Sequence, residues 1–449
     1  MERSIDMTQG KPTGLILRLA IPLILTNLGQ QMYQIVDAII VGRSVGVSAF
    51  ASLGACDWLY WLILWSITAL AQGFSAVVAQ SFGSGDKKRF RKSVAMCILV
   101  SLVFGIVLTI ITVSSASSLL HLLNTEDAIF DGARTYLTAM YCGTMIILAY
   151  NMSGAILRAV GDGKTPLTAM FIAGICNILL DLLFVAFLGW GILGAAGATL
   201  LAQLISFLYC LSAIKRNPVF SMEKSDFQPD KAIILEICRL GIPQALSQCV
   251  TVLGGIYAQS VINSFGYIVV AGCTAANKMH TFMDCSANAL GYAASTYVGQ
   301  NYGAGKLKRI RYGMRSGIAI GLVISAFIMA MVALFGRPMV GLFLSSDVTD
   351  AAAALDVAYH YVLIMSWWLP AAYLMNLFRY SLQGIGNTLA PMLSGGFEMG
   401  ARVLVASFLP PLLGQTGLFH MDGAAWAAAG IFQILCFYIT LHRLQGKKG

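Results

Sequence analysis

The feature that most constrains this chain is a series of apolar stretches, each close to about 20 residues long, that recur along its length. A helix of that length crosses a hydrocarbon core about 30 Å thick. Membrane strands are a poor alternative, because they alternate apolar and polar residues over about ten positions, whereas these stretches are continuously apolar. The composition agrees, since 58% of the residues are hydrophobic and 11% are charged. The sequence predicts an all-α integral membrane protein with about twelve spans.

The spans fall into two sets of six. The first set covers residues 15–41, 50–80, 94–115, 136–157, 167–188 and 193–214, and the second covers 233–262, 269–298, 316–335, 358–382, 390–413 and 424–441. The longest polar stretch, 215–230, separates the sets. We predict an N-terminal six-helix lobe at 1–214, a cytoplasmic linker at 215–232 and a C-terminal six-helix lobe at 233–449.

The two halves also resemble each other in sequence. Three pairs of segments match at a nearly constant offset of about 220 residues, which indicates a duplication. The pairs are Arg18–Pro22 with Arg239–Pro243, Gln80–Arg89 with Gln300–Arg309, and Arg158–Pro166 with Gln383–Pro391.

The formal net charge of +9 comes from basic residues that gather beside the spans, at 87–92, at 306–315 and at Lys447 and Lys448. The positive-inside rule places these segments, and both termini, in the cytoplasm. We expect solvated basic faces there rather than recognition of nucleic acid or lipid headgroups. Because the two matching basic loops lie on one side, the repeat is parallel, and we expect two six-helix bundles with a substrate path between them.

Several function classes are excluded. Gly163-Lys164-Thr165 ends like a phosphate-binding loop, but Arg158 stands where GxxxxGK[ST] needs its first glycine. The sequence contains no HExxH motif, and its ten cysteines show no metal-binding spacing. We therefore predict no enzyme activity and no cofactor, with energy supplied by a gradient or by a partner.

Two carboxylates stand out, because an ionisable group inside a membrane needs a reason to be there. Asp37 lies in the first span and Asp181 in the fifth, and neither has an acidic or basic neighbour within one turn of its own helix. Gln30 and Tyr33 share the face of Asp37 and predict a polar stripe that lines a substrate cavity.

Oxygen-bearing neighbours accompany these carboxylates. Asn177 stands one turn before Asp181, and Thr199 follows Ala195 by one turn on the sixth span. Carboxylate, amide and hydroxyl oxygens suit a hard cation such as Na⁺, and a buried carboxylate also suits a proton. The alternative is a set of interhelical hydrogen bonds, worth only about 0.6–2 kcal/mol each.

The remaining charges within spans have local partners. Glu398 and Arg402 are four residues apart, which favours a structural ion pair on one helix face. Asp284 has His280 one turn earlier and Lys278 nearby, which favours local pairing.

Over essentially its whole length the chain resembles the multidrug and toxic compound extrusion (MATE) family. The likeness is carried by Val36-Asp37, Val41–Arg43, Gly83–Arg89, Gly161–Pro166 and Asn177–Asp181. It implies a cation-coupling site in the N-terminal lobe at Asp37, Asn151, Asn177, Asp181, Ala195 and Thr199, with Asp37, Asn177, Asp181 and Thr199 as the candidate Na⁺ ligands. It also implies a bend of the first helix at Pro22, where proline removes one helix hydrogen bond.

The sequence departs from one branch of that family. The NorM-like branch carries a second acidic set in the C-terminal lobe, whereas this chain has Val250, Thr251 and Asn376 in the corresponding spans. The resemblance is therefore to the DinF-like branch, with coupling in the N-terminal lobe.

The resemblance implies a secondary antiporter that exports small, cationic or lipophilic compounds in exchange for H⁺ or Na⁺ by alternating access. The alternative is a lipid or lipid-linked oligosaccharide flippase of the same superfamily. We expect a multi-pass protein of the cell membrane whose partners are small-molecule substrates and membrane lipid, without nucleic acid or an obligate protein partner.

The topology is testable with single cysteines on a cysteine-free background. We expect Lys88→Cys to react with an impermeant maleimide only after the cells are opened, because position 88 lies in a basic loop. Asp131→Cys, in an acidic segment on the opposite side, should react in intact cells. Labelling of Lys88→Cys alone from outside would reverse the topology.

Overall fold

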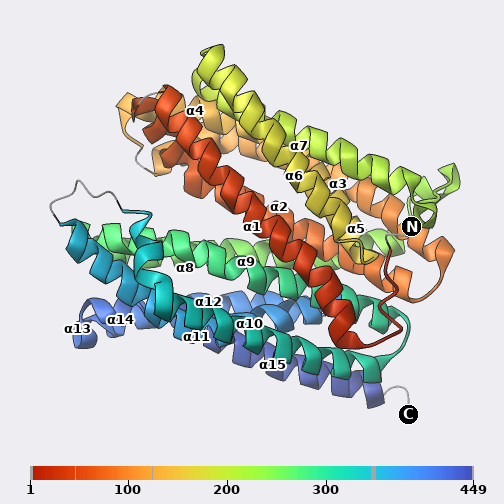
Figure 1. Cartoon of the computed structure of the whole chain (residues 1–449). Coiled ribbons are helices and arrows are strands. Elements are labelled where there is room, and N and C mark those ends of the chain that lie inside the picture. Colours follow the sequence, from red (N-terminus) through yellow and green to blue (C-terminus); the bar gives the residue numbers. More distant parts are fainter. Residues whose placement is uncertain (1–3, 46, 124, 345–349, 447–449) are drawn as a thin grey trace. The chain divides into compact units, whose positions relative to one another are not determined.

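The computed structural model describes residues 4–45, 47–123, 125–344 and 350–446, and the regular elements in these ranges are all helical (Figure 1). The first half contains α1 (Pro12–Val45), α2 (Val47–Gly83), α3 (Lys87–Leu122), α4 (Asp127–Cys142), α5 (Thr144–Ala159), α6 (Lys164–Asp181), the π-helical turn η1 (Leu182–Phe187) and α7 (Gly191–Arg216). Two 3-10 turns, η2 (Pro218–Phe220) and η3 (Lys224–Phe227), follow. The second half contains α8 (Lys231–Asn263), α9 (Tyr267–Gly303), α10 (Leu307–Gly341), α11 (Ala351–Ile385), α12 (Leu389–Phe408), α13 (Pro410–Leu413), α14 (Gln415–Leu418) and α15 (Met421–Gly446).

Every predicted span falls on a helix or on consecutive helices, which confirms the all-α membrane prediction. Within the described ranges ten helices are long and apolar enough to cross a membrane, and α4 with α5 makes an eleventh that bends by 47°. The bend lies at Gly143, where a Cβ would meet the Leu200 side chain of α7 at 2.0 Å. The eighth predicted span lies on α9, which has 37 residues but is less apolar because it carries Lys278 and Asp284.

The matching segments found in the sequence lie at equivalent places in the helices of the two halves. The first helices of the two halves, α1 with 34 residues and α8 with 33, each contain an internal proline, Pro22 and Pro243. The second helices, α2 and α9, both have 37 residues. The duplication seen in the sequence therefore also appears in the described structure, as similar helix lengths and matching proline positions.

The helices form two compact units that divide inside α1 and inside α8. The first unit comprises Met1–Asp6 and Leu25–Ala245, and the second comprises Met7–Ile24 and Leu246–Gly449. In each first helix the division comes two residues after the internal proline. The predicted boundary at 215–232 thus differs from the structural one, because packing assigns the whole linker and the start of α8 to the first unit.

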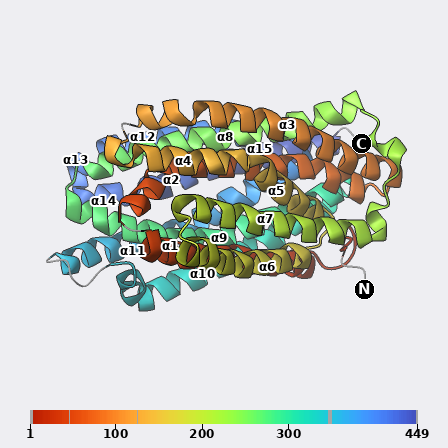
Figure 2. The ribbon, with the colours of Figure 1, turned by 90° about the horizontal axis from the view of Figure 1, so that it is seen from above.

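The first unit has an apolar core built mainly from α2, α3 and α5. Phe74, Val94 and Leu148 are among its fully buried members. Figure 2 shows α2, α3 and α4 side by side in this unit. Residues of this core such as Ile237, on the first part of α8, are also fully buried, which explains why that segment belongs to the first unit.

The linker is fixed to the first unit by ion pairs with the start of α3. Arg91 Nε lies 3.2 Å from Asp226 and Lys92 Nζ lies 2.9 Å from Asp230. The hydrogen bond from Lys92 holds the pKa of Asp230 below its usual range. Arg89 likewise pairs with Glu236 at 3.0 Å. The predicted linker is therefore a docked segment whose acidic residues neutralise a basic cluster.

The second unit is built around α11, which packs on α9, α10 and α15. The chain segment that leads into α1 is bound to this unit through its backbone. The Met7 N–H donates to Gln300 Oε1 (2.8 Å), and Asn301 and Lys306 donate to the carbonyls of Met7 (3.1 Å) and Thr8 (3.0 Å). Met7 itself is fully buried.

Close backbone contact between α2 and α8 predicts a glycine requirement. A Cβ on Gly73 would lie 2.5 Å from Gly241 Cα and 2.8 Å from the Leu240 carbonyl oxygen, so backbone would have to move. We expect Gly73→Ala to lower the free energy of unfolding by roughly 1–3 kcal/mol. Gly197→Ala is the control, because no atom lies within 4 Å of that Cβ. Equal melting temperatures of the two purified variants would contradict the prediction.

Candidate functional site

Within the first unit, α1 and α6 run in the same direction and touch at successive turns. Gly29 of α1 receives the Met170 side chain, whose Cε lies 2.4 Å from a Cβ built on that glycine. One turn further, Gly174 of α6 receives the ring of Tyr33, with the nearest ring atom at 3.3 Å. Each helix thus supplies one glycine that contacts a large side chain of the other helix. These two contacts fix how residues of the next turn face each other.

The next turn brings Asp37 and Asp181 together as direct side-chain neighbours. Asp181, the last residue of α6, is 0% exposed, and Asn177 beside it is 2% exposed. In the part of the chain that the structure describes, no hydrogen-bond partner meets Asp37 Oδ1, either Asp181 carboxylate oxygen or either polar atom of the Asn177 amide. The sequence-predicted residues Asp37, Asn177 and Asp181 therefore form one cluster with unused oxygens.

Electrostatics limits what this cluster can be. Two adjacent carboxylates repel each other when both are ionised, and the repulsion is strong where water is excluded. A proton shared between them, or a small cation with oxygen ligands, removes the repulsion and occupies the unused oxygens. With two carboxylates and one amide on hand, Na⁺ would need further neutral oxygens, whereas a proton would not.

Ala195 lies close to this level of the unit. It packs in a small buried cluster with Val41 and Val185, which follow Asp37 and Asp181 by one turn. Thr199 lies one turn beyond Ala195 on α7, which packs against α6, and its side chain is half-buried. The role of the Thr199 hydroxyl as a further oxygen ligand stays a prediction.

The chain continues from Asp181 directly into the π-helical turn η1. Beyond it the Leu188 N–H donates to the Leu183 carbonyl (2.8 Å) and the Trp190 N–H to the Phe184 carbonyl (2.9 Å). Such turns are rare and often lie at functional sites, because they change the direction of neighbouring side chains. This turn was not predictable from the sequence, because nothing in the apolar run of residues 182–187 distinguishes it from α-helix.

The other predicted residues have different surroundings. Asn151 accepts a hydrogen bond from the Thr68 hydroxyl of α2 (3.2 Å) and donates to the Ile147 carbonyl of its own helix (2.9 Å). It therefore links α5 to α2. Tyr33 lies near Asp37, with Tyr60 and Tyr150 as its other polar aromatic neighbours. Gln30, two turns before Asp37, is half-buried.

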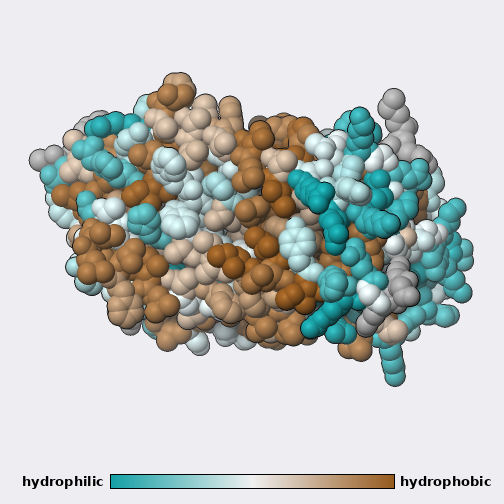
Figure 3. Space-filling view, turned by 90° about the horizontal axis from the view of Figure 1, so that it is seen from below, coloured by the Kyte–Doolittle hydropathy of each residue, from teal (hydrophilic) through white to brown (hydrophobic). Residues whose placement is uncertain are grey.

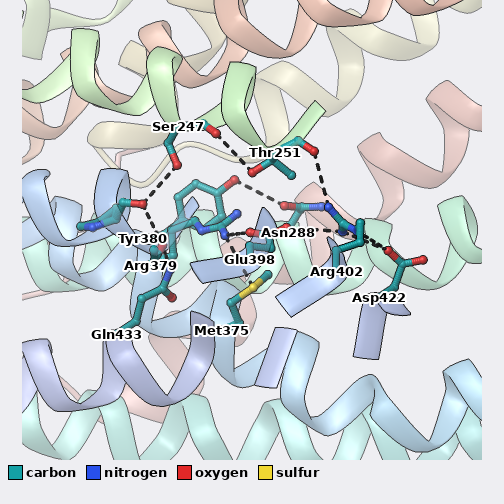
Figure 4. Close-up of polar contacts among 12 residues, drawn as sticks. Ser247, Thr251, Asn288, Met375, Arg379, Tyr380, Glu398, Arg402, Asp422 and Gln433 are labelled. Carbon is teal, nitrogen blue, oxygen red and sulfur yellow. Dashed lines mark hydrogen bonds and ion pairs between the residues drawn. The ribbon is translucent and has the colours of Figure 1, made fainter. Parts of the chain in front are cut away.

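A second polar cluster lies within the second unit (Figure 4). Glu398 of α12 pairs with Arg379 of α11 at 2.5 Å and with Arg402 at 3.7 Å, and Arg402 pairs with Asp422 of α15 at 2.9 Å. The Tyr361 hydroxyl donates to Asp422 (3.1 Å). The predicted Glu398–Arg402 pair is confirmed, but it is one link of a longer chain of charges.

Arg379 is the member that sequence analysis missed. It lies within the apolar tenth predicted span. Asp37 was identified as a charge without a partner on its own helix, and the same criterion would have identified Arg379. The neighbouring Asp284 accepts from Asn288 (2.6 Å), while the His280 ring stacks on Trp426 at 5.2 Å between centroids. The hydrogen-bond partner of Asp284 is thus Asn288, one turn further along α9, and His280, the predicted partner, is an electrostatic neighbour of the carboxylate.

The two clusters differ in charge balance. Arg379 and Arg402 are matched by Glu398 and Asp422, so the chain of charges in the second unit is neutral. The Asp37–Asp181 pair has no basic side chain paired with it among the described residues. The second cluster therefore fits a structural role, and the first fits reversible binding of a cation.

Breaking the chain of charges should destabilise the second unit. We expect Arg379→Met to lower the free energy of unfolding by about 3–5 kcal/mol, because it leaves Glu398 buried with only the longer contact to Arg402. Replacing Glu398 by Met as well should recover much of the loss. The measurement is thermal or denaturant unfolding of the purified protein in detergent.

An exposed ion pair in the same unit provides the control. Arg337 and Asp356 lie 2.7 Å apart with side chains 57% and 53% exposed, so Arg337→Met should cost only about 0–1 kcal/mol. Similar losses in Arg379→Met and Arg337→Met would show that the buried chain of charges is not structural.

Comparison with known proteins places these features in context. The MatE family model matches residues 22–183 and 243–408, so it matches both halves and each match begins at the internal proline. The protein named "Probable multidrug resistance protein YpnP" from Bacillus subtilis (strain 168) is 30% identical over 354 residues, which cover 78% of this chain and 78% of that protein.

Solved structures agree on the fold. The crystal structure of MATE in complex with MaL6 matches with a TM-score of 0.91 at 24% identity, covering 99% of this chain and 100% of that one. A MOP superfamily transporter from Pyrococcus furiosus Vc1 (DSM3638) matches with a TM-score of 0.91 at 24% identity, covering 98% of both chains. At such identities these structures establish the fold alone.

Proposed function

Because the chain belongs to the MatE family, we propose that it is a secondary antiporter that exports small cationic or lipophilic organic compounds in exchange for H⁺ or Na⁺. A relative is named a probable multidrug resistance protein, which supports the substrate class. The observation that carries the proposal is the pair of the half-buried Asp37 and the fully buried Asp181, in which Asp37 Oδ1 and both Asp181 oxygens have no donors among the described residues.

The pair is suited to coupling because its charge can change. When a proton or Na⁺ enters, the repulsion between the two carboxylates falls and α1 can pack closely on α6. When the ion leaves, the negative charge favours a cationic compound nearby. Antiport follows if ion and cargo bind with opposing preference, since linkage makes each one lower the affinity for the other.

Pro22 gives the first helix a place to respond. In the described structure α1 is helical throughout Pro12–Val45, and the change of packing unit falls at Ile24 and Leu25, directly after the proline. Proline removes one backbone hydrogen bond and so lowers the cost of bending at this point. We propose that ion binding at Asp37, about four turns further along α1, is transmitted to this point.

The charges distinguish export of cations from lipid flipping. A flippase that holds phosphate groups needs unpaired basic side chains within the membrane, but Arg379 and Arg402 are each bound to buried carboxylates. Lys278 of α9 is a single exposed lysine, whereas the cluster of like charges that we find in the described spans, Asp37 with Asp181, is acidic. This charge favours cationic cargo. We further propose that the protein lies in the cell membrane with its basic loops and termini in the cytoplasm.

Coupling is tested with the two aspartates. We expect Asp37→Asn and Asp181→Asn to insert and fold normally, while efflux of ethidium driven by an ion gradient falls at least tenfold, because asparagine keeps the shape but cannot exchange a proton or carry charge. The assay is dye movement in proteoliposomes under separate proton and Na⁺ gradients, which also identifies the ion.

Asp356→Asn serves as the control, because this carboxylate is exposed and lies in the second unit. It should transport at the wild-type rate. Full gradient-driven efflux by both Asp37→Asn and Asp181→Asn would show that coupling resides elsewhere. Absence of efflux by the wild-type protein of any cationic dye would count against the substrate class.

A further inference from the structure

The first turns of α10 present basic side chains on one exposed face. Lys308, Arg311 and Arg315 are spaced at i, i+3 and i+7, so they project from the same side of the helix, and all three are exposed. Tyr312 lies beside them and is 59% exposed. This spacing gives an ordered stripe of charge rather than a flexible basic loop.

Two further helices of the same unit extend this stripe. The Thr13 hydroxyl at the start of α1 donates to Ser316 Oγ of α10 (3.0 Å), and Arg311 Nη2 donates to Gln445 Oε1 at the end of α15 (3.1 Å). The ends of α1, α10 and α15 therefore meet. Together they form a surface, here called the basic surface, made of the exposed residues Lys11, Arg18, Lys308, Arg311, Arg315 and Arg443.

The basic surface continues into lipid-facing helix surface. Along α10, Arg315 is followed at steps of four residues by Ala319, Val323 and Phe327, which are all exposed, the last two at 70% and 65%. Along α15 the same step leads from the exposed Arg443 back through exposed aliphatic residues, namely Ile439, Leu435 and Ile431. Figure 3 shows hydrophilic residues gathered beside an extended hydrophobic area. Such residues lie at the depth of the lipid headgroups.

The corresponding cluster of the first unit is partly neutralised by ion pairs, whereas no ion pair is described for the basic surface. At the start of α3, Arg89, Arg91 and Lys92 pair with acidic residues of the linker and α8. In the described ranges of the second unit the carboxylates are Asp284, Asp350, Asp356, Glu398 and Asp422, and none of them pairs with a member of the basic surface. The positive-inside rule accounts for basic residues in both units but not for this difference.

In place of the solvated basic face expected from the sequence, we propose that the basic surface binds the phosphate groups of anionic phospholipids, using Lys308, Arg311 and Arg315 as the central contacts. Arginine donates two parallel hydrogen bonds to a phosphate, and acyl chains can lie on the apolar stripe below. Clusters of four to eight basic residues beside a membrane span bind anionic lipid headgroups. The basic surface belongs to the second unit, whereas the Asp37–Asp181 pair belongs to the first.

The experiment compares lipid binding by purified full-length protein. Native mass spectrometry with phosphatidylglycerol and phosphatidylcholine gives apparent affinities for each. We expect selectivity for phosphatidylglycerol in the wild type, and a decrease of about tenfold to a hundredfold for Lys308→Gln/Arg311→Gln/Arg315→Gln, since each charge near the surface contributes roughly fivefold. Phosphatidylcholine binding should change little.

The control Lys87→Gln/Lys88→Gln/Lys164→Gln removes three exposed lysines from the first unit. It should retain most of the selectivity. Arg311→Lys/Arg315→Lys keeps the charge and should lose less affinity than the glutamine variant. Melting curves of all variants check folding, and salt titration of the wild type, from 50 to 500 mM NaCl, tests the ionic contribution without any substitution.

Three outcomes would overturn the proposal. These are unchanged phosphatidylglycerol binding by the glutamine variant, an equal loss in the first-unit control, and wild-type selectivity that does not respond to salt. Displacement of the lipid by millimolar inorganic phosphate would also overturn it, by showing a site for free phosphate.

Discussion

Hydrocarbon offers no hydrogen-bond partner to a peptide group, so each segment of this chain inside the membrane must satisfy its own backbone, and helices do so. Lipid tails are as apolar as the helix surfaces, so the hydrophobic effect does not drive helices together inside the membrane. The helices therefore need close packing to associate. Here that packing depends on small residues, such as Gly73 against the Gly241 backbone in the first unit and Gly291 against the Tyr380 ring in the second. Because these contacts are intolerant of shifts, they also fix which polar side chains meet.

The polar clusters of the two units show how charge balance separates stability from function. In the second unit the two buried arginines are matched by two carboxylates, Glu398 and Asp422, so removing one member of this chain of charges lowers stability. In the first unit two carboxylates meet without a basic partner among the described residues, which is costly when both are ionised. A cluster that is stable only with an added ion can respond to a gradient, and a neutral one cannot.

Much of the fold was predictable because its signal is local. Span length follows from apolar runs, and the repeat follows from matching segments such as Arg18–Pro22 and Arg239–Pro243. Asp37 and Asp181 were identifiable as unpartnered charges, but their meeting was not, because it depends on the register that Gly29 and Gly174 set between α1 and α6. The π-helical turn and the route of Asn151 toward Thr68 depend on packing between helices and have no local signal.

The start of α1 packs in the second unit and the start of α8 packs in the first, and this arrangement constrains how the chain folds during synthesis. Met7 leaves the ribosome early, yet the side chain that binds its N–H belongs to Gln300, 293 residues later. The start of α1 must therefore wait without its final neighbours while the whole first unit is synthesised, and the core of that unit is completed only by the start of α8. Closing such distant contacts is slow compared with local helix formation. The two halves of the sequence do not coincide with the two compact units, and a chain cut at 214 would leave each unit without a helix segment that packs in it.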